Sequence, residues 1–306
     1  MIHITEDEVV ARLPMNAAIE CLRSAFDAYG RGQAVNQPRR RLVLPTGAVL
    51  HQMAASCGDY FGTKVYSTHA RHGAWFTFHL FDSRTARPVA QFEANHLGQI
   101  RTGAASGLAT DLLAPRRPLT VAVIGSGFQA RSQVEAIRDV REIGEMRIYS
   151  RSEEKRERFA WEVRGVASGS AADACEDADV IVTATSSKEP VFPASVVKSG
   201  ALILAMGANT ASRSEVPPEV VLNSEVIVDD VQQCQLEAGD LLKAGVDWSS
   251  VIPLADLVRG KTKAGDGRLL LFKSVGLALE DVAVASHVYE QTILARSSAG
   301  RNHAMR

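Results

Sequence analysis

Apolar and polar residues follow different patterns in successive parts of the chain. Up to Gly30 the apolar positions recur at helical spacing, and Thr5 with Glu8 has the arrangement of a capping box, while Pro14 can begin a second helix. From residue 39 to about residue 93, short runs rich in β-branched and aromatic residues alternate with Gly, Pro and Asp turns. We therefore expect a helical start followed by an antiparallel sheet.

After the predicted sheet, residues 96–113 predict a helix rich in small residues, and Pro115 to Pro118 punctuate its end. Apolar strands such as DVIVTAT, ALILAM and EVIVDD then alternate with helical stretches, which is typical of right-handed βαβ units. The last segment, beginning FKSVGLALED, has apolar residues at helical spacing and is expected to pack back onto the first domain. The predicted fold is α/β: a Rossmann-type doubly wound parallel sheet over residues 115–274, and a mixed α+β domain from residues 1–114 and 275–306.

The segment LTVAVIGSGFQARSQVEAI joins a buried strand to a helix through a GxGxxA turn. Gly125 permits the tight turn, Gly127 lets the backbone approach a pyrophosphate, and Ala130 lets the helix lie close to the strand. This pattern predicts that the chain binds a dinucleotide at the start of the helix. The expected contacts of the turn itself are Gly125, Gly127, Phe128 and Gln129.

The second strand of this domain bears on which dinucleotide is used. It ends at Ser150 and is followed by Arg151, where related folds place the residue that meets the adenine ribose. An acid there would repel a 2′-phosphate, whereas Ser150, Arg151 and Lys155 can hold one through charge-assisted hydrogen bonds. We therefore expect NADP in preference to NAD, although the basic residues also suit a solvated helix start.

Composition narrows the class of partner. The chain has 306 residues, 46% hydrophobic and 23% charged, with a formal net charge of −1 and dispersed basic residues. A chain of this length can fold into two hydrophobic cores. It lacks the concentrated positive charge that binds nucleic acid or a membrane surface. No apolar run approaches the roughly 20 residues of a membrane span, and MIHITEDEVV lacks a signal pattern. We expect a cytoplasmic protein that binds a small metabolite.

Cysteine and histidine spacing does not predict a disulfide framework or a metal site. The four cysteines are scattered without a CxxC pair. His69, His72 and His79 lie in a segment that predicts a hairpin, where they do not share a helical face. We expect reduced thiols and no bound metal.

Five segments, in this order and spacing, resemble the ornithine cyclodeaminase and mu-crystallin family over nearly the whole chain: GTKVYS, IRTGAASGLATDLLA, VIGSGFQA, ILAMGANT and FKSVGLALED. The resemblance implies that the first domain binds the substrate and forms a homodimer through its sheet. It also implies a nicotinamide cofactor and an amino or imino acid substrate.

The resemblance further implies which side chains meet the substrate. Lys64 would lie beside the substrate carboxylate and the reacting carbon, although the residue pattern alone favours a surface lysine. An arginine of the cluster 39–41 would clamp the carboxylate; spacing to Pro45 favours Arg41, and spacing back from Met53 favours Arg40. His51 is either a residue of the substrate site or proton donor, or a structural histidine.

The same resemblance implies further cofactor contacts. Arg101 would meet the cofactor phosphates, or alternatively form a salt bridge at the domain interface. The other expected contacts are Thr77, Thr102, Thr185, Met206, Arg213 and Ser274. The hydroxyls among them, those of the threonines and the serine, can alternatively cap local backbone.

Asn209, in ILAMGANT, distinguishes the reaction. The cyclodeaminases and related alanine dehydrogenases carry an aspartate there, which exchanges the proton of the substrate amine. An asparagine keeps the shape but cannot exchange a proton near neutral pH. Lys273 lies in FKSVG, where cyclodeaminases have FDSVG. It therefore also favours the mu-crystallin and reductase branch of the family, unless it is simply a surface residue.

We therefore predict an NAD(P)H-dependent reductase of cyclic ketimine carboxylates, in which Lys64 and Asn209 serve the reaction. The expected substrates are Δ1-pyrroline-2-carboxylate and Δ1-piperideine-2-carboxylate, giving L-proline and L-pipecolate. The alternatives are an ornithine cyclodeaminase or alanine-type dehydrogenase, and a non-catalytic protein that binds NADPH and a small ligand.

Overall fold

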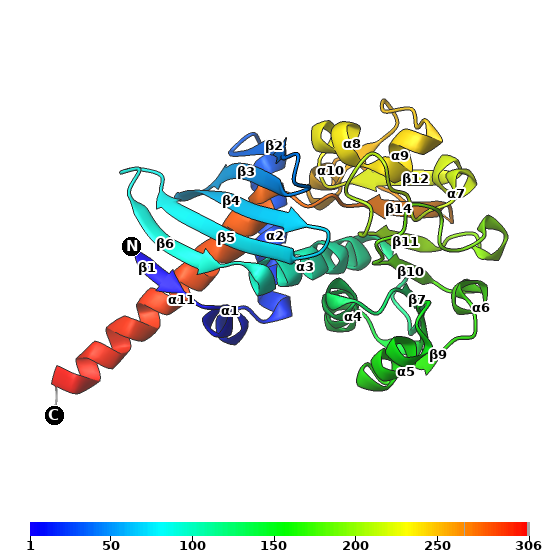
Figure 1. The fold of residues 1–306 in the computed structure, drawn as a ribbon, viewed down its shortest axis with the longest axis horizontal. Coiled ribbons are helices and arrows are strands. Elements are labelled where there is room, and N and C mark those ends of the chain that lie inside the picture. The colour runs from blue at the N-terminus through cyan, green and yellow to red at the C-terminus, as the bar shows by residue number, and fades with distance from the viewer. Residues whose placement is uncertain (266, 305–306) are drawn as a thin grey trace. The chain divides into compact units, whose positions relative to one another are not determined.

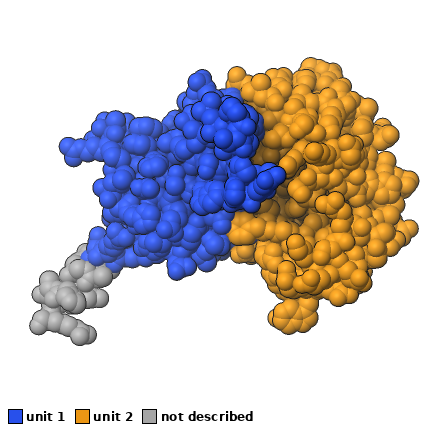
Figure 2. All heavy atoms as spheres, viewed as in Figure 1, with its two compact units in different colours: residues 1–101, 277–306 blue, residues 102–276 orange. Residues whose placement is uncertain are grey.

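The chain divides into two compact units, which Figure 2 colours separately. Each unit is built around its own sheet. The structure is a computed structural model that describes residues 1–265 and 267–304. The first unit comprises Met1–Arg101 and Leu277–Arg306, and the second comprises Thr102–Gly276. This α/β organisation, with one mixed sheet and one parallel sheet, confirms the predicted fold class.

The sheet of the first unit has six strands in the order β1-β6-β5-β4-β3-β2. Its strands β2 to β6 pair antiparallel, as predicted, while β1 pairs parallel with β6. The sequence did not predict β1, because three residues are too few to show an alternating pattern. The strands are Ile2–Ile4 (β1), Ala34–Val43 (β2), Val49–Cys57 (β3), Tyr60–His69 (β4), Gly73–Asp82 (β5) and Pro88–Glu93 (β6).

Helices α1 (Glu6–Arg12), α2 (Met15–Gly30) and α11 (Ala278–Ala304) complete this unit, together with the first turns of α3 (Asn95–Leu113). The capping box is present, since the Thr5 side chain accepts from the Glu8 amide and the Glu8 carboxylate accepts from the Thr5 amide. Helix α11, red in Figure 1, runs along β3 and β4 and also packs against α2. The C-terminal segment therefore returns to the first sheet, as the sequence predicts.

The second unit has eight strands, all paired in parallel among the described residues, in the order β13-β12-β14-β11-β10-β7-β8-β9. Its central strands are continuous apolar runs because helices cover both faces. The strands are Leu119–Ile124 (β7), Ile143–Tyr149 (β8), Val166–Ala167 (β9), Val180–Thr183 (β10), Leu202–Ala205 (β11), Ser224–Val228 (β12), Ile252–Pro253 (β13) and Leu269–Lys273 (β14).

The connections of the second unit are mostly short helices. They are Phe128–Val140 (α4), Glu153–Glu162 (α5), Ala171–Cys175 (α6), Ala194–Val196 (η1, a 3-10 turn), Pro218–Leu222 (α7), Val231–Glu237 (α8), Gly239–Ala244 (α9) and Leu254–Val258 (α10). Helix α3 packs so closely against α4 that a side chain at Gly103 would overlap the backbone of Ser132. The small residues predicted in α3 thus serve close helix packing.

Two expectations differ from the structure. The division between units falls within α3, after Arg101, whereas the sequence placed it after residue 114, because the helix continues across the division without a break. Phe272 and Lys273 belong to β14 rather than to the start of the last helix. Lys273 is fully buried, so the interpretation as a surface residue is wrong; it ends a strand that lies between β11 and β12. None of the helices described is both long and apolar enough for a membrane crossing.

Candidate functional site

The register of the first sheet places several predicted residues on one face. Lys64 lies opposite Met53 on β3, and Tyr66 lies opposite His51. Arg41 on β2 is in turn paired with His51. Because neighbouring residues of a strand point to opposite faces, these side chains share a face. Helix α11 covers that face, since its Asp281 contacts Lys64.

Lys64 is buried, with an exposed fraction of 2%, so it is not a surface lysine. Its Nζ donates to Asp281 Oδ1 at 2.8 Å. A Cβ at Gly98 of α3 would come within 2.8 Å of the same nitrogen, so glycine there leaves room for the ammonium. Burial lowers the pKa of Lys64, and Arg101 and Arg39 lower it further, against the opposing effect of Asp281.

Arg101 forms a second buried ion pair beside the first. Its Nη1 donates to Glu280 Oε2 at 2.8 Å, and its Nε lies 3.4 Å from Asp281 Oδ1. Burial alone would lower the pKa of Arg101, but Asp281 and Glu280 raise it, so the guanidinium stays charged. Both acidic partners belong to the same unit as Arg101, so these ion pairs are not the interface salt bridge that the sequence offered as an alternative. The contact of Arg101 with cofactor phosphates stays a prediction.

The sequence interpretation missed Glu280 and Asp281. Both are buried carboxylates in the first turn of α11. Two adjacent acids within the apolar stretch VGLALEDVAVA were the available signal, because acids rarely occupy buried positions without a partner.

The arginine cluster is divided between the two faces of the sheet. Arg40 and Arg41 are both exposed, but Arg40 pairs with Gln52, on the face opposite to Lys64, whereas Arg41 pairs with His51 on the face of Lys64. A β-bulge precedes Arg40, and it turns Arg39 inward, where its Nε donates to Met53 Sδ at 3.3 Å. The geometry thus favours Arg41 over Arg40 as a carboxylate clamp and adds Arg39.

His51 is held as a neutral imidazole. Its ring stacks on Tyr66 at 4.2 Å between centroids, and its Nε2 lies 3.0 Å from Thr68 Oγ1. Its Nδ1 is buried with no hydrogen-bond partner. Burial, followed by Arg41 and Arg39, lowers the pKa of His51 to about 4. At neutral pH it therefore has no proton to give as an acid, and it offers hydrogen bonds instead.

The glycine turn of the second unit has the geometry that the motif predicts. Gly125 has a φ of +122°, and a side chain there would overlap the carbonyl oxygen of Ala184. A Cβ on Gly127 would meet no atom within 4 Å, and no side chain caps the start of α4. Gln129 Oε1, in the first turn, is buried without a partner. The first amides of α4 therefore face open space without a capping side chain, and no acid in the first turn would repel an anion. This arrangement fits a pyrophosphate.

At the predicted ribose position, Ser150 follows β8 and accepts a hydrogen bond from Ser126 Oγ at 3.0 Å. Arg151 and Lys155 are exposed, and Arg156, which the sequence interpretation did not single out, donates to the Ser150 carbonyl at 3.3 Å. Neither position 150 nor position 151 carries an acid. The arrangement is compatible with a 2′-phosphate.

Several predicted cofactor contacts have structural partners. The hydroxyls of Thr77, Thr185 and Ser274 donate to Val65 O, Glu215 Oε1 and Asp229 Oδ2, and Met206 Sδ accepts from Ser106. The Thr102 carbonyl accepts from Gln133, and Arg213 is half-buried. Asn209 follows β11 and is half-buried. The roles of these residues toward a cofactor or substrate stay predictions.

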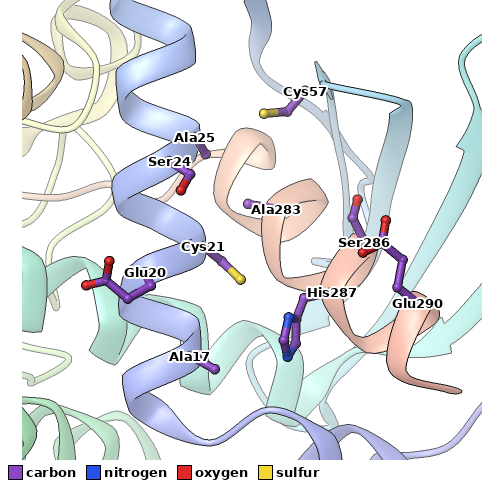
Figure 3. Close-up of a pocket in the computed structure, with 10 residues that line it drawn as sticks. All are labelled: Ala17, Glu20, Cys21, Ser24, Ala25, Cys57, Ala283, Ser286, His287 and Glu290. Carbon is purple, nitrogen blue, oxygen red and sulfur yellow. The ribbon is translucent and has the colours of Figure 1, made fainter. Parts of the chain in front are cut away.

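A hollow of 490 Å³ lies between α2 and α11, as Figure 3 shows. Its lining includes Cys21, Cys57, Glu20, His287 and Glu290, but none of the predicted site residues. Burial, followed by Glu290 and Glu20, raises the pKa of Cys21 to about 11, so this thiol is protonated at neutral pH. Among the described side chains, no group of three or more His, Cys, Asp or Glu residues is arranged to hold a metal ion.

Comparison with known proteins shows which family shares this sequence and fold. The sequence profile of the ornithine cyclodeaminase/mu-crystallin family matches residues 2–295. The chain belongs to this family. An alanine dehydrogenase from Archaeoglobus fulgidus is 33% identical over 95% of the chain and 94% of its own length. A Delta(1)-pyrroline-2-carboxylate reductase from Bacillus cereus is 36% identical over 70% of each.

Solved structures of the family have the same fold. The Thermococcus litoralis Delta(1)-pyrroline-2-carboxylate reductase, in complex with NADH and L-proline, has a TM-score of 0.90, with 27% identity over 96% of this chain and 98% of its own. An archaeal alanine dehydrogenase dimer with bound NAD has a TM-score of 0.91, with 30% identity over 97% of each chain. The predicted family and fold are thus confirmed.

The open space at Gly127 predicts a substitution that separates cofactor binding from folding. Gly127→Ala places a methyl group where the pyrophosphate would approach, so we expect NADPH and NADH to bind at least about tenfold more weakly. The free energy of unfolding should fall by only about 1 kcal/mol, the usual cost of alanine at a helix N-cap. Cofactor titration by fluorescence and urea unfolding measure the two effects.

Gly144→Ala is the matched control, because Gly144 lies at the opposite end of β8 and a Cβ there makes ordinary contacts. Its cofactor affinity should match that of the wild type. Unchanged affinity in Gly127→Ala would contradict the assignment of the turn to the pyrophosphate.

Proposed function

We propose that the chain reduces the C=N bond of cyclic ketimine carboxylates, with Δ1-pyrroline-2-carboxylate or Δ1-piperideine-2-carboxylate as substrate and NADPH as the preferred cofactor. As a member of a family whose relatives are dehydrogenases and reductases, the chain is an NAD(P)-dependent oxidoreductase. The observation that carries the finer assignment is Asn209 at the end of β11.

Asn209 lies just beyond the carboxyl end of a parallel strand, which is where α/β sheets hold reactive groups. A primary ammonium, with a pKa of about 10.4, must lose a proton before it can give up a hydride. An amide cannot take that proton near neutral pH. A cyclic imine is a weaker base and can enter already protonated, so it needs only a hydride and correct orientation. Reduction therefore tolerates an asparagine where amine oxidation does not.

The first unit supplies the charge for the substrate carboxylate. Lys64 and Arg101 are paired with Asp281 and Glu280, and Arg39 lies on the same face, so the face keeps a net positive charge. The neutral His51 ring adds no competing charge. Cations held in a buried site act more strongly on an anion than cations in water.

We assign the carboxylate of the substrate to Lys64 and Arg41, with Arg39 as a further candidate. The planar guanidinium of Arg41 can hold a carboxylate bidentately. The lowered pKa of Lys64 also lets it donate a proton to a ring nitrogen that enters unprotonated. Asn209 would then orient that nitrogen.

The second unit supplies the cofactor site. The amides after Gly127 and the side chain of Gln129 would hold the pyrophosphate, and Ser150 with Arg151 would hold a 2′-phosphate. A bound nicotinamide supplies the hydride. Because relatives have been solved with NADH and NAD, both cofactors belong in every assay.

A panel of substrates tests the proposal. We expect oxidation of NADPH with Δ1-pyrroline-2-carboxylate or its six-membered analogue, and no ammonia release from ornithine. NADPH should be preferred over NADH by about tenfold or more in kcat/KM, because a charge-assisted hydrogen bond contributes about 1.5–3 kcal/mol. Ammonia release from ornithine with catalytic NAD would overturn the reductase assignment.

An alanine dehydrogenase is the second candidate, because the Archaeoglobus fulgidus relative matches 95% of the chain. Faster cofactor oxidation with pyruvate and ammonia than with either cyclic imine would favour it. Tight NADPH binding without turnover of any substrate would instead favour a non-catalytic binding protein.

A single substitution tests the role of Asn209. Asn209→Asp restores a proton acceptor, so we expect it to confer measurable oxidation of amino acids at alkaline pH and to change the pH profile of imine reduction. Asn223→Asp, at the exposed C-cap of α7, is the matched control and should leave both unchanged. If Asn209→Asp behaves like this control, Asn209 does not determine the direction of the chemistry.

We further propose that the protein is a homodimer formed through the sheet of the first unit. Helices α2 and α11 pack against the sheet, and α11 contacts the face that carries Lys64. The opposite face carries Leu42 and Trp75, which are 58% and 60% exposed, and the stacked rings of Phe61 and Phe81. An apolar sheet face of this kind is typical of a subunit interface, and an archaeal relative is a dimer.

Trp75→Glu should convert the dimer to a monomer in light scattering, because it buries a carboxylate in the interface. Trp161→Glu is the matched control, since Trp161 is 84% exposed on α5 of the other unit, and it should leave the dimer intact. A dimer that survives Trp75→Glu unchanged would argue against this face.

A further inference from the structure

A buried carboxylate, Glu215, ties together two loops of the second unit. Its Oε1 accepts from the Thr185 amide at 2.7 Å and from the Thr185 hydroxyl at 2.6 Å. Its Oε2 accepts from the Ala208 amide at 3.0 Å and from Thr183 Oγ1 at 3.3 Å. Glu215 has an exposed fraction of 0%, so these donors replace the water that a carboxylate needs.

The two loops lie where a ligand is expected. Thr185 follows β10 and Ala208 follows β11, and these strands are adjacent and parallel. The carboxyl ends of such strands form the ligand-binding edge of a doubly wound sheet. Ala208 immediately precedes Asn209, so the oxygen that holds the Ala208 amide also fixes the start of the Asn209 peptide.

The fit between the loops leaves little space for adjustment. A side chain at Gly207 would overlap the Glu215 carboxylate and the carbonyl oxygen of Thr185. The loop after β11 therefore passes directly against both groups. A change in the carboxylate would be transmitted to this loop, because no intervening side chain can absorb it.

Glu215 is itself held by a buried ion pair. Asp240 Oδ1 accepts from the amides of Glu215 and Val216, at 2.5 and 3.0 Å, and Asp240 Oδ2 lies 2.8 Å from Lys273 Nζ. Burial raises the pKa of Glu215, and Lys273 opposes that rise. Lys273 ends β14, which pairs with β11, so the network spans the carboxyl edges of three neighbouring strands.

We propose that Glu215 is a positioning residue that sets the spacing of the loops after β10 and β11 and thereby the orientation of Asn209 toward the substrate. The inference rests on the proposed reduction, and it extends it to a residue that need not touch substrate or cofactor. A carboxylate is required because it accepts on both sides. A glutamine presents one NH₂ group, so one of the two loops then faces a donor instead of an acceptor.

The test compares Glu215→Gln with Asp179→Asn in the full-length protein. Asp179 is a matched control: it is a buried carboxylate at the amino end of β10 and accepts from Arg117, Lys198 and the Thr120 amide. Both substitutions should lower the melting temperature. Glu215→Gln alone should lower kcat by about 10- to 100-fold with a nearly unchanged KM for the imine, because small misplacements of reacting groups cost this much.

Two further readouts separate positioning from general loss of stability. With NADPH deuterated at the transferred position, the isotope effect on kcat should rise in Glu215→Gln and stay at the wild-type value in Asp179→Asn. The dissociation constant for NADPH, measured by fluorescence, should rise severalfold in Glu215→Gln, because its loop also carries Thr185. This binding readout needs no substrate.

The outcomes are distinguishable. If the wild type binds NADPH but reduces no imine, while Glu215→Gln alone weakens NADPH binding, the proposed function fails and the positioning of the loops by Glu215 stands. If Glu215→Gln lowers only the melting temperature, as Asp179→Asn does, the inference is overturned. Should Glu215→Gln not fold, the near-isosteric Thr183→Val removes one donor to the same carboxylate. Thr183→Val should lower kcat, raise the isotope effect on kcat and weaken NADPH binding, each to a smaller extent than Glu215→Gln. Wild-type kinetics in Thr183→Val would overturn the inference.

Discussion

Charges buried in a dry interior must be paired, and this constraint organises both units. In the first unit, Asp281 and Glu280 arrive on the first turn of α11 and pair with the buried Lys64 and Arg101. Removing one partner of such a buried pair costs about 3–5 kcal/mol. The return of the C-terminal segment to the first sheet is therefore fixed by ion pairs as well as by apolar packing.

The same constraint gives the proposed site its chemistry. Cations that are already desolvated and held in place need little reorganisation when an anionic substrate arrives. In the second unit, Glu215, Asp240 and Lys273 form a comparable buried network at the strand ends. Substrate binding, orientation and fixed charges would then drive the reaction. This suits the reduction of an imine, which needs no base, better than the oxidation of an ammonium, which must first lose a proton to a base.

Local signals in the sequence predicted most of the fold. The glycine turn, the Thr5 capping box and the alternating strands depend on residues close together in the chain. The partners of Lys64 and Arg101 were not predictable in this way, because Asp281 meets Lys64 only after the chain has folded back. Spacing along the chain left Arg40 and Arg41 open for a related reason: it does not show which face of the sheet each side chain takes after the β-bulge that precedes Arg40.

The most direct test of the account follows the hydride itself. The protein would be incubated with Δ1-pyrroline-2-carboxylate and NADPH deuterated at the transferred position, and the product analysed by mass spectrometry. The account predicts L-proline carrying a single deuterium on the carbon that bears the carboxylate. Proline without deuterium, or no proline while ornithine releases ammonia, would contradict it.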